Sequence, residues 1–261
     1  MPELPAAEAN RRRVEAGALH RTIAAISVDD PGPMTMPTPA EQKRLIGTQF
    51  TQARRYGKYV FLGSATGPWL VISLGMTGII QTYDETEGAP KHAKLTVTFE
   101  GDRRLAYICP RKFGDAYVAE SVEAFVAEHK LGPDALEIGK AEFAERVGPS
   151  KSAIKTVLMD QSRLAGIGNL WSDETLYRVG LSPEIPANAL GDNRLGDIHA
   201  AAQEILQAAV DTPDAPKSLP DDWLVHHRKP GAPCPRCGGT IKKKSIGGRS
   251  AYFCPDHQEG A

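Results

Sequence analysis

The fold is decided by the stretch CPRCGGTIKKKSIGGRSAYFCPDH, residues 234–257, near the end of the 261-residue chain. It contains two pairs of soft ligands, each split by two residues, with sixteen residues between the pairs. Two such pairs can close a tetrahedral zinc site between two turns. The spacing predicts one structural zinc ion per chain, held by Cys234, Cys237, Cys254 and His257. A module of about forty residues has too little core to fold alone, so the metal supplies much of its stability.

Positive charge is concentrated around this stretch. Seven basic residues and no acidic one lie between Leu224 and Phe253, although the whole chain has a net charge of −1. A solvated surface would normally interleave acidic residues, so the bias favours contact with a nucleic-acid backbone. Gly247 and Gly248 permit a tight hairpin tip from which Arg249 can approach a phosphate. A zinc-ribbon RNA-binding protein remains an alternative reading of these residues.

Composition excludes several classes of protein. No run approaches the roughly 20 apolar residues of a membrane helix, and the N-terminus lacks the apolar core of a secretory signal. Three of the four cysteines fall in the last 28 residues, which favours metal binding in a reducing compartment over a disulfide scaffold. We therefore expect a cytoplasmic protein with no membrane contact.

Periodicity divides the rest of the chain, and predicts an α+β protein. Residues 1–120 read mainly as β, because residues 94–100 alternate polar and apolar and residues 58–63 and 69–74 are short apolar runs bounded by glycine. Residues 6–18 are the exception and read as a helix, so we expect a β-sandwich or barrel with a leading helix. Residues 121–220 read as a helical domain ending in a linker at 212–220, and residues 221–261 form the zinc module. The expected helices cover residues 122–130, 141–147, 151–159, 170–179 and 195–210.

A glycine-rich turn separates two of these helices. Gly166 and Gly168 allow backbone conformations that leave amide groups pointing at an anion beside a helix N-terminus, and Asn169 can donate a further hydrogen bond. The turn alone is a weak signal. Next to a basic zinc module, it favours a clamp on the DNA backbone.

Taken in order, the motifs resemble those of the formamidopyrimidine-DNA glycosylase / endonuclease VIII family. The resemblance covers essentially the whole chain and rests on residues 2–5 (PELP), 57–59 (GKY), 74–78 (LGMTG), 91–92 (KH), 110–114 (PRKFG), 158–161 (LMDQ), 166–169 (GIGN) and the zinc ribbon. It implies an N-terminal β-sandwich with its leading helix, and a helical domain with a helix–two-turn–helix motif and a zinc finger. DNA would lie between the two.

The resemblance also implies a covalent mechanism. Removal of Met1 would leave Pro2 with a secondary amine that attacks the sugar C1′ atom, expels the damaged base and forms a Schiff base. Glu3 would serve as the acid and base, and Lys58 would lie near the reacting sugar or phosphate. The strand would then be cut at the abasic site by β- and δ-elimination.

Further residues are assigned to DNA by the same resemblance. Met76, Arg111 and Phe113 would fill the gap left by the flipped nucleotide and hold the orphaned base. Phosphates would be bound by Lys91, His92, Asn169 and Arg249. The expected partner is damaged double-stranded DNA in the nucleoid, bound by a monomer.

Several departures from the family pattern bear on activity. Ala6, Ser73 and Cys109 stand where relatives commonly have glutamate, histidine and aspartate, and His257 replaces the usual fourth cysteine. The segment between residue 210 and Cys234 is short for a loop that caps a flipped purine, so 8-oxoguanine is expected to be a poor substrate, and oxidised pyrimidines, other lesions or abasic sites better ones. The departures leave a second hypothesis, a catalytically altered or inactive DNA-binding protein of the same fold.

Overall fold

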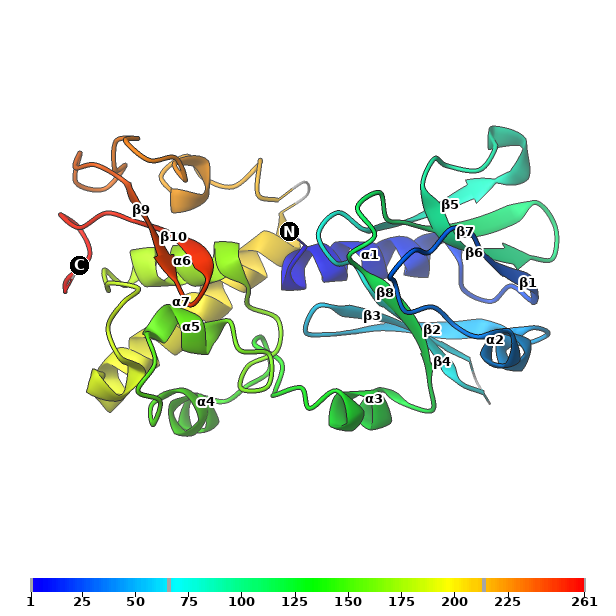
Figure 1. The fold of residues 1–261 in the computed structure, drawn as a ribbon, viewed down its shortest axis with the longest axis horizontal. Coiled ribbons are helices and arrows are strands. Elements are labelled where there is room, and N and C mark those ends of the chain that lie inside the picture. The colour runs from blue at the N-terminus through cyan, green and yellow to red at the C-terminus, as the bar shows by residue number, and fades with distance from the viewer. Residues whose placement is uncertain (1, 65–66, 213–214, 261) are drawn as a thin grey trace. The chain divides into compact units, whose positions relative to one another are not determined.

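The computed structural model describes residues 2–64, 67–212 and 215–260. Met1 and part of the expected 212–220 linker therefore lie outside the described residues. The chain forms two compact units, residues 1–130 and 131–261 (Figure 1). Helix α3 (Val122–Glu128) belongs to the first unit because Phe125 packs edge-on against Tyr59, Phe61 and Tyr117 of the sandwich, with ring centroids 5.0–5.4 Å apart.

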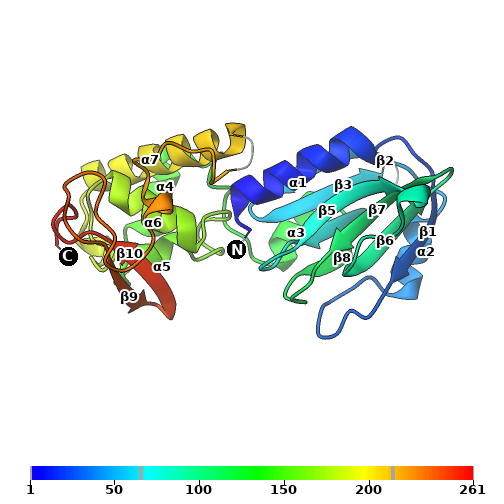
Figure 2. The ribbon, with the colours of Figure 1, turned by 90° about the horizontal axis from the view of Figure 1, so that it is seen from above.

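The first unit is the expected β-sandwich. Its two antiparallel sheets have the strand orders β1-β6-β7-β5 and β2-β3-β4-β8 (Figure 2). The alternation over residues 94–100 is confirmed, since Leu95, Val97 and Phe99 of β6 are buried between the sheets. The strands are β1 Ile23–Val28, β2 Phe50–Tyr56, β3 Tyr59–Ser64, β4 Trp69–Ser73, β5 Ile79–Asp84, β6 Ala93–Phe99, β7 Arg103–Ile108 and β8 Asp115–Ala119. Two short helical segments, α2 (Pro39–Leu45) and the 3₁₀ turn η1 (Glu85–Glu87), connect them.

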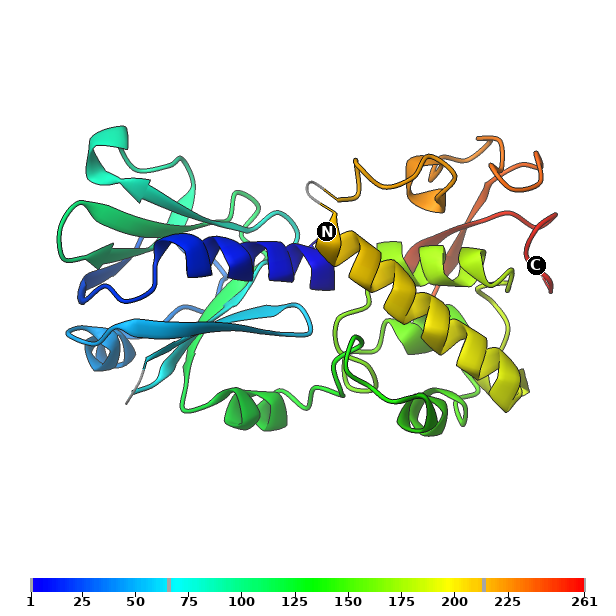
Figure 3. The ribbon, with the colours of Figure 1, turned by 180° about the vertical axis from the view of Figure 1, so that it is seen from behind.

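The leading helix α1 (Leu4–Gly17) closes one side of the sandwich, where it contacts β2, β3 and β5 (Figure 3). Leu4, Ala7 and Val14 form its fully buried face. Asn10 is also buried, and its side-chain oxygen accepts a hydrogen bond from the Ile80 backbone N–H at 2.6 Å. Its amide nitrogen donates to the Ala6 carbonyl at 2.8 Å. The buried side chain of Asn10 thus joins the helix to the start of strand β5, and both its oxygen and its nitrogen are hydrogen-bonded.

The second unit contains the expected helices, although helix α7 begins at Asp192, three residues before the expected start, and helix α5 begins late. Helix α7 crosses α4 and α6 (Figure 3). The helix expected over residues 151–159 begins only at Ile154, because residues 152–154 pair with the segment 185–187: the Ile154 N–H donates to the Ile185 carbonyl and the Ala187 N–H to the Ser152 carbonyl. The helices are α4 Lys140–Val147, α5 Ile154–Leu158, α6 Asn169–Arg178 and α7 Asp192–Asp211, with 3₁₀ turns η2 Ala187–Ala189 and η3 Leu224–His226.

The zinc module shares a core with helix α6. Its hairpin consists of β9 (Lys242–Ile246) and β10 (Arg249–Phe253). A buried cluster joins it to the helix through Tyr177, Leu224, Cys234, Ile241 and Cys254. The small module is therefore stabilised by apolar burial against helix α6, in addition to the stabilisation expected from the metal. Among the described residues, no helix is long and apolar enough to cross a membrane.

The Asn10 bond makes a prediction about stability. Asn10→Ala leaves the Ile80 N–H without its partner, so we expect the free energy of unfolding to fall by about 1–3 kcal/mol. Asn193→Ala, which removes an exposed asparagine from helix α7, is the matched control. Urea unfolding followed by circular dichroism measures both. Equal midpoints for the two variants would contradict the role given to Asn10.

Candidate active site and metal centre

The predicted catalytic pair lies at the start of helix α1. Glu3 is the residue immediately before the helix, its carbonyl accepts the Ala7 N–H at 3.0 Å, and its side chain is only 2 % exposed. Pro2 precedes it and is partly exposed. The pair thus combines an accessible proline ring with a shielded carboxyl group.

Helix α1 points its N-terminal end past the start of β5, because Asn10 bonds to Ile80 and Gly17 lies beside Thr82 farther along that strand. Strand register places the other candidates of this unit at the same end of the sandwich. In one sheet Tyr59 pairs with Ser73 and Ser73 with Asp115, so the turn carrying Lys58 lies at the end where β4 finishes and β8 begins. Lys58 belongs to the β2–β3 turn, one residue before the strand on which it was expected.

The second sheet brings the remaining loops to that end. Ile108, the last residue of β7, pairs with Ile79 at the start of β5 and with Ala93 at the start of β6. Lys91 and His92 are exposed immediately before β6, and the His92 carbonyl accepts the Cys109 N–H at 3.0 Å. The phosphate-binding candidates therefore lie beside the loop that continues to Arg111 and Phe113.

Two loops carry the predicted void-filling residues, and they are in contact. Gly75 has a φ of +59°, and a side chain there would overlap the Phe113 carbonyl; a side chain at Gly114 would overlap the Tyr107 hydroxyl. Burial raises the pKa of Tyr107, which keeps its hydroxyl protonated to donate to the Ser73 carbonyl at 2.7 Å. Both glycines are thus required by close backbone approach, and a buried hydroxyl anchors the place where the loops meet.

Phe113 is the most exposed large hydrophobic side chain described, at 59 %. The guanidinium carbon of Arg111 lies 5.4 Å from its ring centroid. Between them Lys112 points back to Asp30, with Nζ and Oδ2 2.7 Å apart, and its hydrogen bond and charge lower the pKa of Asp30. Met76 is half-buried on the neighbouring turn. The arrangement offers DNA a flat apolar ring and a cation side by side.

In the second unit, Gln161 shapes the glycine turn before helix α6. Its side-chain nitrogen donates to the Met159 and Ile167 carbonyls, both at 2.8 Å, and its oxygen accepts the Gly166 N–H at 3.0 Å. Asn169 opens the helix, and its side-chain oxygen is buried without a hydrogen-bond partner among the described residues. Sequence reasoning assigned Asn169 to an anion but gave Gln161 no role, although an amide side chain beside Gly166 was the available signal.

A buried group of charges lies behind this turn. Lys155 and Asp173 are fully buried, and Nζ lies 2.6 Å from Oδ1. Lys155 also donates to the Asn169 carbonyl at 3.2 Å, and Arg228 lies 2.9 Å from the second oxygen of Asp173. Burial raises the pKa of Asp173, while Lys155 and Arg228 act in the opposite direction. Arg228 therefore pairs inside the unit, whereas the sequence counted it among the basic residues around the zinc ribbon.

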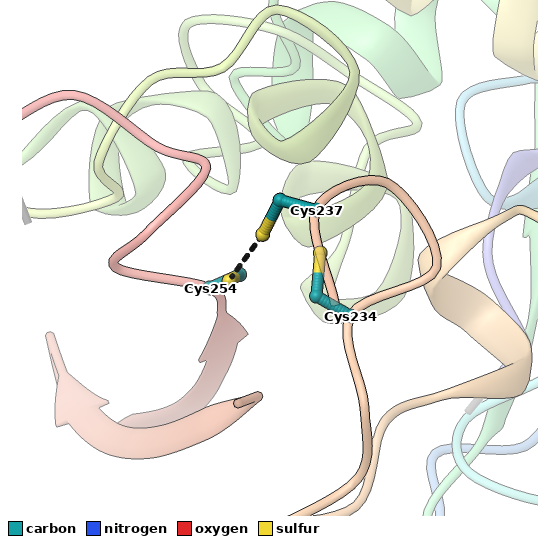
Figure 4. Close-up of side chains that lie close together, drawn as sticks. All are labelled: Cys234, Cys237 and Cys254. Carbon is teal, nitrogen blue, oxygen red and sulfur yellow. Dashed lines mark hydrogen bonds between the residues drawn. The ribbon is translucent and has the colours of Figure 1, made fainter. Parts of the chain in front are cut away.

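The structure brings together only some of the expected metal ligands. The sulfur atoms of Cys234, Cys237 and Cys254 lie within 4.8 Å of one another, and those of Cys237 and Cys254 are 3.5 Å apart (Figure 4). Three thiols at this separation fit a thiophilic ion such as zinc. His257 is outside this cluster, and its Nε2 lies 2.9 Å from the Tyr177 carbonyl oxygen. The structure thus assembles three of the four expected ligand groups.

Comparison with known families covers almost the whole chain. The formamidopyrimidine-DNA glycosylase N-terminal domain matches residues 1–116, and the H2TH domain of the same glycosylase matches residues 131–218. A zinc finger found in FPG and IleRS matches residues 231–256. These three models follow the order that the motifs predicted.

Individual relatives give the same result. The chain is 32 % identical to a formamidopyrimidine-DNA glycosylase of Geobacter metallireducens and 29 % identical to one of Laribacter hongkongensis, with 98 % of each chain covered in both cases. Among solved structures, it is similar to the Lactococcus lactis enzyme bound non-covalently to DNA containing an AP site, with a TM-score of 0.87, 29 % identity, and 98 % of this chain and 99 % of that chain covered. A MutM complex with DNA containing carbocyclic 8-oxo-G gives a TM-score of 0.86 at 29 % identity. The chain belongs to the formamidopyrimidine-DNA glycosylase family.

Proposed function

We propose that the protein is a base excision repair DNA glycosylase that also cleaves the abasic site it creates. The observation that carries the proposal is the gathering of Pro2, Glu3 and the exposed Arg111–Phe113 loop at one end of the sandwich, in a chain of this family. The substrate is damaged double-stranded DNA, bound by a monomer. Because its substrate is DNA, we place the working protein at the nucleoid.

The first steps transfer the sugar from the base to the protein. The unprotonated secondary amine of Pro2 attacks C1′ and the bond from C1′ to the base nitrogen breaks. The amine nitrogen loses its proton, and the departing base takes one up. Glu3 protonates the ring oxygen as the sugar opens, which leaves an iminium between C1′ and the Pro2 nitrogen. The buried carboxyl of Glu3 next to the amine supports this role, and Lys58 provides positive charge near the sugar or phosphate.

Elimination then cuts the strand. The iminium withdraws electrons from C2′, so loss of a C2′ proton expels the 3′ phosphate, and a second elimination expels the 5′ phosphate. Water hydrolyses the remaining Schiff base and restores the Pro2 amine. Phosphates along the strand would contact Lys91 and His92 from the first unit and Asn169 and Arg249 from the second.

The flipped nucleotide leaves a gap that the protein must fill. The exposed ring of Phe113 and the thioether of Met76 are suited to enter the base stack, and Arg111 is suited to hydrogen-bond the unpaired base. The zinc ion is structural and supplies folding free energy to the hairpin that carries Arg249.

We expect trapping of the covalent intermediate to depend on Pro2. With DNA containing one abasic site, borohydride should reduce the iminium and join protein to DNA. Pro2→Gly presents a primary amine, whose Schiff base is neutral unless it gains a proton, and should therefore lose most of the adduct. Glu3→Gln should slow base excision while leaving DNA binding intact. A wild-type protein that binds abasic DNA without forming any adduct would instead support the inactive DNA-binding alternative raised by Ala6, Ser73 and Cys109.

A second prediction concerns Phe113. Phe113→Ala should slow excision of a paired lesion by about 1–3 kcal/mol of lost stacking, roughly 5- to 150-fold in rate. Stability should stay unchanged because the ring is largely exposed. Ile46→Ala, which truncates a 40 % exposed side chain elsewhere, is the control. The effect should be smaller on a single-stranded abasic site, and equal slowing of both substrates would argue against a void-filling role.

The third prediction concerns the lesion. The segment after helix α7 turns inward, with Leu219 and Trp223 buried at 4 % and 6 % exposure, so these side chains are used for packing and are not projected as a cap. We expect 8-oxoguanine to be excised about tenfold more slowly than formamidopyrimidine or thymine glycol, a difference of roughly 1.4 kcal/mol in activation free energy. Single-turnover rates on matched duplexes measure this. Comparable rates for 8-oxoguanine and thymine glycol would refute it.

A further inference from the structure

We propose that Tyr177 is a positioning residue of the zinc site, acting from helix α6 through both its hydroxyl and its carbonyl. The carbonyl holds the ring of His257 so that Nδ1, which lies outside the cluster of three thiols, is the nitrogen that binds zinc when the ion is present. The inference concerns metal retention and does not depend on the glycosylase reaction.

The side chain of Tyr177 supplies the first contact. The residue is 1 % exposed, and its hydroxyl oxygen lies 3.1 Å from the sulfur of Cys234. When the sulfur binds zinc as a thiolate it has no proton, so the phenol must be the donor. A hydrogen bond of this kind fixes the direction of the sulfur lone pairs and partly neutralises its charge.

The main chain of the same residue supplies the second contact. The Tyr177 carbonyl lies 2.9 Å from Nε2 of His257, and the two rings pack edge-on with centroids 4.9 Å apart. A carbonyl can only accept, so Nε2 carries the proton, and in a neutral imidazole the lone pair is then on Nδ1. Metal-binding histidines commonly donate their other ring N–H to such an acceptor. The contact therefore selects the tautomer that can ligate through Nδ1.

A third contact anchors the same turn. The Gln258 side-chain nitrogen donates to the Leu181 carbonyl at 2.7 Å, and its oxygen accepts the Cys254 N–H at 2.9 Å. The turn carrying Cys254 and His257 is thereby fixed to the residues at the end of helix α6. Both halves of the zinc site thus depend on one short stretch, residues 177–181, at the end of helix α6 and just after it.

Release of zinc tests the proposal. Full-length zinc-loaded protein is mixed with excess EDTA, and first-order loss of the ion is followed by quenched samples with a colorimetric zinc indicator. Tyr177→Phe removes one oxygen atom and should release zinc about tenfold faster, the size typical of lost contacts to metal ligands. Tyr252→Phe, on the same hairpin, is the control and should match the wild type. His257→Ala should release zinc faster still, and His257→Cys should restore retention.

Cobalt provides a second measurement on the unaltered protein. Cobalt-loaded wild type should show visible absorption bands of a tetrahedral site with three sulfur ligands and one nitrogen, and His257→Ala should lose the nitrogen ligand. Thermal melts of the zinc-loaded variants separate lost retention from lost folding. Wild-type release rates in a folded Tyr177→Phe would overturn the role of the hydroxyl. A cobalt spectrum without a nitrogen ligand would overturn the assignment of His257.

Discussion

The hydrogen bond from Ile80 to the side chain of Asn10 is the constraint on which the geometry of the first unit depends. Pro2 and Glu3 stand immediately before helix α1, and strand β5 follows directly after the turn that carries Met76. Apolar packing alone would let a helix slide or rotate against the sheets, because hydrophobic contact is non-directional. A directional bond at 2.6 Å between buried atoms removes that freedom. The proposed nucleophile, Pro2, and the turn that carries Met76 are therefore held in a fixed position relative to each other.

In the second unit, a buried group of charges fixes the relative positions of the segments. Asp173 joins Lys155 of helix α5 to Arg228 of the segment before the zinc hairpin, and it accepts the Tyr252 N–H of β10 at 3.1 Å. Removing one member of such a buried group costs about 3–5 kcal/mol, because an uncompensated charge remains. The glycine turn and the hairpin are each held through this carboxylate. The phosphate-binding candidates Asn169 and Arg249 thus belong to segments that Asp173 links.

Much of the fold could be predicted from the sequence because local residue patterns indicate individual strands, helices and metal ligands. The alternation in residues 94–100, the helical spacings and the paired cysteines all correspond to elements of the structure. The late start of helix α5 was missed, because the pairing of residues 152–154 with 185–187 is long-range and leaves no periodic signal. For the same reason Asn10 and Asp173 went unnoticed: a buried polar residue within a helix looks the same in sequence as an exposed one.

The residues of the candidate site could be predicted from the family motifs, whereas the residues that support them could not. The motifs identify Phe113 and Asn169, whereas Tyr107, Gln161 and Tyr177 act through contacts between distant segments. His257 illustrates the difference. Its spacing from Cys254 predicts a ligand, but the orientation of its ring depends on a carbonyl eighty residues earlier.

The exposed ring of Phe113 has a thermodynamic consequence. An aromatic side chain kept in water orders solvent around it until it enters a stack of bases, and transfer of that apolar area out of water lowers the heat capacity of the complex. Engagement of a lesion should therefore become more exothermic as the temperature rises. Contacts with phosphates alone carry no such signature, so calorimetry can distinguish protein that has inserted its ring from protein that merely rests on the DNA surface.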